Sequence, residues 1–376
     1  MALAGVWGAS AQETPTADDA QPFDWSVGLR GQYTLDSGGG HVETVLTPDA
    51  SIRFFGPRDQ TTLRMGATLA YDGAVHPDEL RLGADSSYEF DPLTRGTTNV
   101  DLTLNQLRAN DTSLPANTAI GPLEFTGTAA TSVTRKFGLF DLTGRLNGER
   151  FMEGPLTLDD ASVVDNAYQS YWLGGGGLRL GYEFTPLISV FIDGSQTYRK
   201  YDAPSPSLLA PLDGRTTELR GGVSYTQEGI LSAEASLGRA WLDYDAASLN
   251  DAPTWVYDAS LSFNPDETLN VGGSFQTTLG PSDTVAGDTD VDYVLTGNAR
   301  YTVNPWLTLR SSASWDRTIT LGSGDDTTTY SVGAGLDFAT SKHVAWTADY
   351  LFKRTGTPPS PVSDSHTVSV GVRVKR

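Results

Sequence analysis

Long stretches of alternating apolar and polar residues, interrupted again and again at a proline, are the feature that most limits how this chain can fold. Residues 301–315 read YTVNPWLTLRSSASW, with Asn304-Pro305 between two such stretches. A period of two predicts β-strands with one apolar and one polar face. Proline fixes φ and removes a ladder donor, so it predicts a chain reversal between strands. The same punctuation recurs at RFFGPR (53–58), YEFDPL (88–93), YEFTPL (182–187) and SFNPDE (262–267).

The alternation marks about 18 segments of about 9 to 14 residues, an even number in the range of outer-membrane barrels. The fold class is therefore predicted to be all-β, a transmembrane antiparallel up-and-down barrel. The predicted strands are 24–35, 45–55, 61–72, 79–90, 97–108, 129–137, 140–151, 171–184, 187–200, 216–227, 230–244, 252–263, 268–279, 291–303, 306–320, 327–338, 343–355 and 365–375. A soluble all-β protein is the main alternative, but its strands average only about 5 to 6 residues. A β-solenoid would need a fixed short repeat period, which the sequence lacks.

The connections alternate between tight turns and longer acidic loops rich in Gly, Pro and Ser. Outer-membrane barrels have short periplasmic turns and long extracellular loops, so both termini are predicted to lie in the periplasm. The two longest loops, 109–127 and 152–170, are candidates to fold over or into the lumen and constrict it.

Aromatic residues cluster near both ends of the predicted strands, as in the two interfacial girdles of membrane barrels. The predicted periplasmic girdle is Phe54, Phe90, Phe137, Phe184, Phe263, Tyr301, Trp306, Phe338 and Trp346. The predicted outer girdle is Tyr33, Tyr71, Trp172, Tyr198, Tyr257, Tyr293, Trp315, Tyr330 and Phe352.

If the apolar parity faces lipid, the other parity lines a lumen that is polar and mixed in sign. The residues predicted to set its selectivity are Arg53, Arg64, Arg145, Arg179, Arg220, Arg300, Arg310, Asp193, Asp316 and Asp349. One interpretation is a cationic entrance for an anionic solute, with Arg53, Arg64, Arg300 and Arg310 near the periplasmic mouth. The other, which the surplus of acids favours, is that the arginines pair with inward carboxylates and hold the wall in shape. Only Phe55, Phe191 and Tyr201 are candidate lumen aromatics, so a wide, weakly binding conduit fits better than a specific sugar channel.

Composition excludes several classes of protein. The formal charge of −20 argues against nucleic acid as a partner, and the absence of cysteine excludes a disulfide framework. No apolar run approaches the length of a membrane-spanning helix. Ala9-Ser10-Ala11 resembles a signal cleavage site, so residues 1–11 are interpreted as a signal-peptide remnant, 12–23 as a flexible periplasmic leader and 24–376 as the barrel.

Enzyme motifs are scarce, and no cofactor or metal is expected. The chain has four histidines and lacks the H-E-x-x-H, G-x-S-x-G and P-loop patterns. A barrel enzyme using His343 with Asp349 is the weakest functional alternative. The acidic loop GSGDDT (322–327) lacks the ligand spacing of a calcium-binding loop, so solvated acids are the better interpretation.

The repeated aromatic-x-Pro turns between long amphipathic strands, in an acidic chain without cysteine, resemble the putative β-barrel porin 2 family of Gram-negative outer-membrane proteins over residues 24–376. The resemblance implies a large barrel in the outer membrane, in contact with its lipid and lipopolysaccharide. Many members are associated with exopolysaccharide secretion. The resemblance therefore implies an exit conduit for a polysaccharide, working beside a periplasmic polysaccharide export protein. The alternative is a general diffusion porin for small hydrophilic solutes.

One departure from this class concerns the C-terminus. Barrels of this class usually end in an aromatic residue that the assembly machinery reads, whereas this chain ends in SVGVRVKR. The alternating valines of this segment keep the pattern of a last strand.

Overall fold

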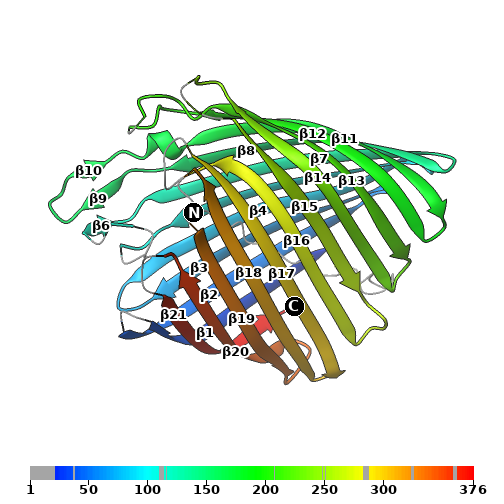
Figure 1. The fold of residues 1–376 in the computed structure, drawn as a ribbon. Coiled ribbons are helices and arrows are strands. Elements are labelled where there is room, and N and C mark those ends of the chain that lie inside the picture. The colour runs from blue at the N-terminus through cyan, green and yellow to red at the C-terminus, as the bar shows by residue number, and fades with distance from the viewer. Residues whose placement is uncertain are drawn as a thin grey trace.

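The computed structural model describes residues 22–36, 39–109, 114–115, 117–206, 208–247, 249, 251–282, 288–322, 326–358 and 362–376. Eighteen of its strands form one closed antiparallel barrel (Figure 1). These strands are β1 (Phe23–Asp36), β2 (Gly39–Phe55), β3 (Asp59–Tyr71), β4 (Val75–Asp91), β5 (Thr94–Gln106), β7 (Leu123–Phe137), β8 (Phe140–Glu153), β11 (Tyr171–Thr185), β12 (Ile188–Tyr201), β13 (Gly214–Gln227), β14 (Leu231–Tyr244), β15 (Ala252–Phe263), β16 (Leu269–Pro281), β17 (Thr289–Asn304), β18 (Leu307–Leu321), β19 (Asp326–Ala339), β20 (Val344–Gly356) and β21 (Ser363–Lys375).

The barrel is an up-and-down meander, because each of its strands pairs with the next barrel strand along the chain. The ring closes where β1 pairs with β21 from Ser26 opposite Lys375 to Leu35 opposite His366. Both described chain ends lie at the same end of the barrel as the tight turns, called here the turn end; the opposite end, where the longer connections lie, is the loop end. The predicted all-β barrel of about 18 strands is confirmed.

The strand bounds differ from the sequence-based ones mainly at the loop end. The second barrel strand begins at residue 39 rather than 45, and the sixth at 123 rather than 129. The added segment 39–44 begins with two glycines and so resembles a loop, whereas the added segment 123–128, LEFTGT, keeps the alternation of the strand. The predicted signal remnant and most of the predicted leader lie outside the described residues.

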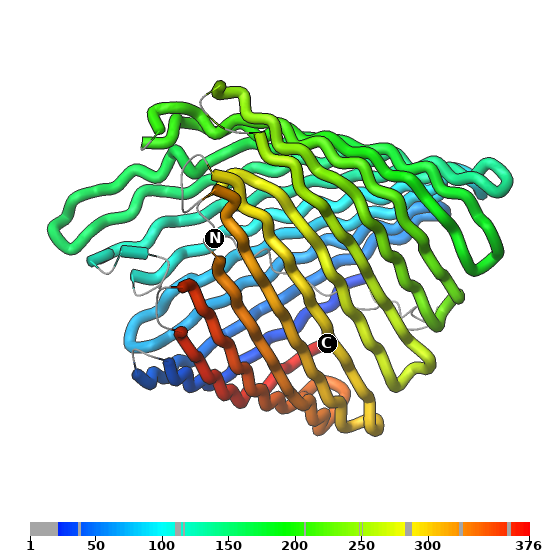
Figure 2. The backbone as a smooth tube through the Cα atoms, viewed as in Figure 1, coloured from blue at the N-terminus to red at the C-terminus, as the bar shows by residue number. Residues whose placement is uncertain are grey.

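The two longest connections form a small sheet of their own. It contains β6 (Thr118–Ile120), β9 (Leu156–Leu158) and β10 (Val163–Val164), and a 3₁₀ turn η1 (Ala167–Gln169) follows. Figures 1 and 2 show this sheet projecting beyond the neighbouring strand ends and away from the barrel. The described parts of both loops therefore pair with each other instead of folding into the lumen, and the predicted loop 109–127 already includes the start of β7.

The turn chemistry explains why Asn, Asp or Thr precedes the tight reversals. The Asn304 side-chain oxygen accepts hydrogen bonds from the backbone N–H groups of Trp306 and Leu307, at 3.0 and 2.9 Å. Asp266 accepts in the same way from Thr268 and Leu269. These bonds, first that of the Thr268 hydroxyl, hold the pKa of the Asp266 carboxyl below its usual value. Such side chains satisfy backbone donors that the ladder leaves free at the reversal.

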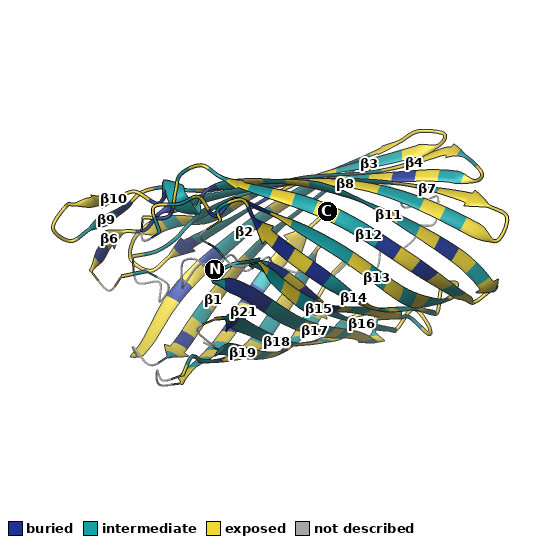
Figure 3. Ribbon diagram, turned by 45° about the horizontal axis from the view of Figure 1, so that its top comes forward, coloured by how far each residue is buried: buried dark blue, intermediate teal, exposed yellow. Residues whose placement is uncertain are grey.

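Along most strands exposed residues alternate with partly buried ones, as the colours of Figure 3 show. Large apolar side chains such as Leu146, Leu178 and Val370 point outward and are exposed. Most predicted girdle aromatics, including Phe184 and Trp172, are exposed on the same face. No helix in the described chain is long and apolar enough to cross a membrane.

One part of the wall is built differently. β15 and β16 pair only between Asp258–Phe263 and Val271–Gln276, whereas β14 and β15 pair along the whole of β15. Beyond this short ladder, the outward face of β16–β18 packs against the inward face of β14 and β15. The resulting apolar cluster contains Ala240, Leu242, Tyr244, Val256, Leu279 and Val291, with Leu249, Tyr293 and Leu321 at its margin.

Hydrogen bonds fix this double layer. The Thr277 hydroxyl accepts a bond from the Tyr257 backbone N–H at 3.2 Å, beyond the point where the strand ladder ends. Tyr244 Oη donates to the Asp288 carbonyl at 3.1 Å and lies 3.0 Å from Thr289 Oγ1. A Cβ built on Gly280 would lie 3.2 Å from Arg199 Nη1, which belongs to β12. The loop-end parts of β16 and β17 therefore lie inside the barrel, beneath β12–β15. Tyr293, predicted for the outer girdle, packs at the margin of the cluster because its strand belongs to the inner layer.

Candidate functional site

The candidate site is the polar inner wall, where four of the predicted residues meet in one network. Arg145 Nη2 donates to Asp193 at 2.6 Å across the intervening strand β11. In the strand registers, Asp193 lies directly opposite both Arg179 and Arg220. Asp193 is buried, and its position between three guanidinium groups gives its carboxylate cationic neighbours on both adjoining strands.

Acidic residues of the following strands complete this network. Arg179 makes a two-point contact with Glu234, at 2.8 and 2.7 Å. Arg220 bonds Glu218 at 2.6 Å and lies 3.4 Å from Asp258. The network therefore spans β8 and β11–β15 with alternating signs. Arginine presents a planar fork that suits such two-point carboxylate contacts.

A second network occupies the wall near the turn end. Arg310 Nη2 donates to Asp337 at 3.0 Å and to Asp349 at 2.8 Å. Arg300 lies directly opposite Arg310 in the β17–β18 register. Arg300 is exposed and, in the part of the chain that the structure describes, makes no ion pair. Of these two arginines predicted near the periplasmic mouth, Arg310 is therefore neutralised and Arg300 has no carboxylate partner among the described residues.

The remaining predicted residues are distributed around the ring. Arg53 pairs with Asp24 at 2.7 Å, and Arg64 pairs with Asp85 at 2.8 Å and Asp101 at 3.3 Å. Asp316 makes no ion pair with another described residue, and Lys353 is its cationic neighbour. Of the seven arginines named from the sequence, six are thus paired with inward carboxylates, which agrees with the interpretation as wall pairs.

The lumen aromatics are more numerous than the sequence suggested. The Arg179 guanidinium lies over the Phe191 ring, with 3.5 Å between the guanidinium carbon and the ring centroid. Tyr201 neighbours Tyr171, with 5.5 Å between ring centroids, and Tyr171 stacks on Phe151 at 5.5 Å. Arg199 lies 4.5 Å from the Tyr171 centroid. The rings of Phe151, Tyr171 and Tyr201 lie at the loop end of the lumen, and Phe191 lies near its turn end, all on the face opposite to the exposed apolar residues.

Sequence reasoning missed Tyr171 and Phe151 because both stand at strand ends, where the parity of a short apolar run is hard to assign. Phe55, the third predicted lumen aromatic, is exposed at the turn end of β2.

Arg108 was also missed, because it is the last residue of the predicted strand 97–108 and falls on the outward parity there, whereas β5 ends at Gln106. Its guanidinium bonds Asp78 at 3.0 and 2.6 Å and Glu43 at 2.8 Å. The hydrogen bonds that Arg108 donates, first those to Asp78, hold the pKa of Arg108 above its usual value. This cluster joins the connection after β5 to β2 and β4.

The residues proposed for a barrel enzyme do not meet. The His343 ring Nδ1–H donates to the Lys375 carbonyl, 3.1 Å away in the last strand. Asp349 instead accepts from Arg310. Among the described residues, no group of three or more His, Asp or Glu is arranged to hold a metal ion.

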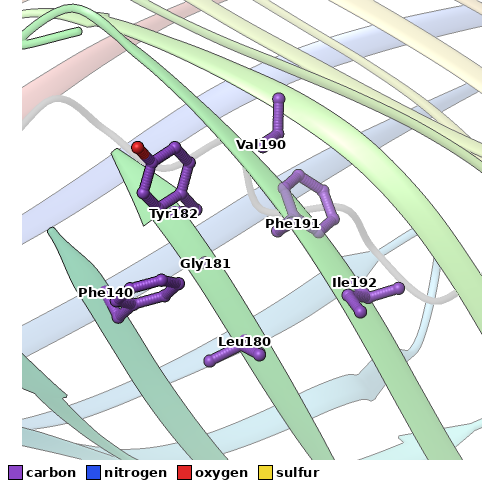
Figure 4. A pocket seen from close by; sticks show the side chains of 7 residues that line it. All are labelled: Phe140, Leu180, Gly181, Tyr182, Val190, Phe191 and Ile192. Atoms are coloured by element: carbon purple, nitrogen blue, oxygen red, sulfur yellow. The ribbon is translucent and has the colours of Figure 1, made fainter. Parts of the chain in front are cut away.

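A shallow apolar groove of about 240 Å³ lies at the turn end of β8, β11 and β12 (Figure 4). Phe140, Leu180, Tyr182, Val190 and Ile192 line it, and each belongs to the outward parity of its strand. Gly181 and Phe191, of the inward parity, complete its lining.

Comparisons with known proteins identify the family to which the chain belongs. The model of the family described as "Putative beta-barrel porin 2" matches residues 36–376. Similar solved structures include OpdL of Pseudomonas aeruginosa, with 15% identity, a TM-score of 0.43, and coverage of 94% of this chain and 98% of that one. OccAB4 of Acinetobacter baumannii has 10% identity, a TM-score of 0.41, and coverage of 96% and 100%. No curated protein matches the chain.

The family description speaks of a porin, and no finding supports polysaccharide export. The alternative of a general porin, stated above beside the export conduit, therefore fits better. A closed 18-stranded barrel with an apolar outer face is also the structure that a chain needs to cross a membrane with strands. The chain belongs to the putative β-barrel porin 2 family and forms a porin-like channel of the outer membrane.

Proposed function

We propose that this protein is a general diffusion porin for small hydrophilic solutes. The observation that carries the proposal is the ion-paired inner wall. Six of its seven predicted arginines have carboxylate partners, as in the Arg145–Asp193 and Arg179–Glu234 pairs. A wall whose charges neutralise each other offers a solute few free groups, so it supports passage with weak binding.

The constriction, in this proposal, is the inner layer formed by the loop-end parts of β16–β18. These segments lie beneath β12–β15 and reduce the width of the lumen from one side. Because they are strands held by an apolar interface, they form a fixed restriction and not a mobile plug. The restriction sets an upper size for the solute.

Liposome swelling tests the function. Purified protein is reconstituted, and entry rates are compared for uncharged sugars from a pentose to a tetrasaccharide. We expect rates that fall steadily with solute size and rise linearly with concentration. Saturation at millimolar sugar, or a strong preference between stereoisomers of one size, would show a specific binding site and contradict general diffusion.

A matched pair of variants tests the constriction. Leu279→Ala shortens a side chain that holds the inner layer, and Leu295→Ala makes the same change on the outward face of the neighbouring strand. We expect only Leu279→Ala to alter single-channel conductance or its noise in planar bilayers. Equal conductance in both variants and in the unchanged protein would place the constriction elsewhere.

A further inference from the structure

The outward face at the loop end of β8 and β11–β15 carries a group of basic residues. Arg150, Lys200, Arg215 and Arg239 belong to β8, β12, β13 and β14, and they are called here the basic patch. All four lie on the parity that faces away from the lumen. They are unusual there, because this chain carries a formal charge of −20.

The strand registers bring these residues together with aromatic rings. Trp172 lies directly opposite both Arg150 and Lys200, on the two neighbours of β11. Arg215 lies opposite Tyr198, and Arg239 lies opposite Trp255. The patch is therefore a continuous surface across six neighbouring strands.

Two of the guanidinium groups rest on these rings. Arg150 lies 4.9 Å from the Trp172 ring centroid, and Arg239 lies 5.4 Å from that of Trp255. Such contacts hold a cation at the level of the aromatic belt, where headgroups meet the hydrocarbon layer. Exposed Ile192, Leu219 and Leu237 lie on the same outward face, further toward the turn end.

The cations of the basic patch differ from those of the opposite wall in whether they have carboxylate partners. There, the outward-facing Arg317 and Arg354 are each neutralised, by Asp326 and Asp364, through two-point contacts. In the patch, Arg150 bonds Asp202. Lys200, Arg215 and Arg239 make no ion pair with any described residue.

Two other acids lie close to the patch. Asp245 accepts the Tyr198 hydroxyl at 2.7 Å. Asp243 is opposite Arg215 in register but does not form an ion pair with it. Three cations thus remain available to an external anion.

We propose that the basic patch binds the phosphorylated headgroup of a glycolipid in the outer leaflet. The ligand needs an apolar part for the exposed leucines and isoleucine, and an anionic part for the three available cations at the rim. A phosphorylated membrane lipid supplies both, whereas free phosphate supplies only the second. This inference rests on the outer-membrane location and is independent of the solute that the channel passes.

Native mass spectrometry in a neutral detergent tests the proposal with bisphosphorylated lipid A as the probe. The test variant is Lys200→Gln/Arg215→Gln/Arg239→Gln. The control variant Arg317→Gln/Arg354→Gln removes two cations from the opposite wall. We expect the test variant to bind the probe at least roughly tenfold more weakly than the unchanged protein, and the control to bind it within about twofold.

Dephosphorylated lipid A separates the two parts of the ligand, since all three proteins should bind it equally and weakly. Inorganic phosphate at millimolar concentration should not displace the probe. Displacement by phosphate would show a general anion site, and equal probe binding by the test and control variants would show that the patch is not the site. Either result overturns the proposal.

Bilayer conductance checks that the test variant still forms the barrel. If it does not, the single variant Lys200→Gln replaces it, because Lys200 is exposed at a strand end. A measurable loss of probe affinity is then expected, and an unchanged affinity counts against the proposal.

Discussion

Two regions of the wall contrast: the single layer of β7, β8 and β11, and the double layer where β16–β18 lie beneath β14 and β15. In the single layer, outward residues such as Leu146 and Leu178 are among the most exposed of the chain, at 65% and 63%. In the double layer, Val291 has the same outward parity but is only 1% exposed. Strand parity alone therefore does not determine the environment of a residue; the second layer changes what that face contacts.

The difference shows how a barrel can narrow its lumen without an inserted loop. A sheet that leaves the wall exposes an apolar face, and that face must be covered. Here the inward residues of β14 and β15 provide the cover, because Leu242 and Val256 stand where other strands carry polar lumen residues. The two apolar faces stabilise each other as in a sheet sandwich.

The largest expected effect is that of a charge inside the double layer. Val256→Arg places a guanidinium at a side chain that is 0% exposed. We expect a loss of about 3–5 kcal/mol in the free energy of unfolding, the usual cost of an unpaired buried charge. Urea titration in lipid vesicles, followed by tryptophan fluorescence, measures it. A loss below that of an outward single-layer site would break the comparison.

The next effect concerns the lipid-facing single layer. Val370→Arg lies mid-strand in β21 on the outward face and should cost about 2–4 kcal/mol. Ser312→Arg, on the inward face of β18, should change stability little. Heat-induced gel mobility shifts and the same urea titration compare the two, and equal losses would contradict the assignment of faces.

A smaller effect is expected where a hydrogen bond joins the two layers. Tyr244→Phe removes the bond to the Asp288 carbonyl and should cost about 0.5–1.5 kcal/mol. Channel noise should rise as the inner layer loosens. Tyr182→Phe is the control, because Tyr182 lies on the outward groove at the turn end. Similar noise in both variants would argue against a layer held by Tyr244.

The smallest effect on stability is expected for Arg300, which lies in the lumen. Arg300→Glu should shift ion selectivity toward cations with less than about 1 kcal/mol of destabilisation, because Arg300 is exposed and makes no ion pair with the residues that the structure describes. Arg310→Glu should shift selectivity too but also destabilise, since it leaves Asp337 and Asp349 without their partner. Reversal potentials in planar bilayers and urea titrations separate the two. Unchanged reversal potentials for Arg300→Glu would remove it from the selectivity residues.

Much of the fold follows from local sequence. Period two and turn chemistry identify the strands because each strand pairs with its neighbour in the chain, so local patterns carry the topology. The double layer could not be predicted in this way. The alternation around Thr277 and Val291 continues unchanged, and only the β15–β16 register shows that the ladder stops at Asp258 opposite Gln276.

The sequence was enough to predict which arginines and acids line the candidate site, but not which arginine pairs with which carboxylate. Parity identifies which arginines point inward, but a partner such as Glu234 for Arg179 lies three strands away, in a position that depends on strand stagger. Arg108 escaped for another reason, because its partners Asp78 and Glu43 lie near strand ends at the rim.

The pairing of β1 with β21 has a consequence for the order of assembly. Every other barrel pairing joins consecutive barrel strands through a connection much shorter than the chain, so closing each of these hairpins costs comparatively little entropy. The pairing of Ser26 with Lys375 must bring together residues from opposite ends of the chain, and it is the only one that leaves the sheet without edges. Until the last strand arrives, the nascent sheet exposes two unpaired borders. The last strand therefore completes the ring. Its pairing continues to Arg376, whose N–H donates to the Trp25 carbonyl at 3.0 Å.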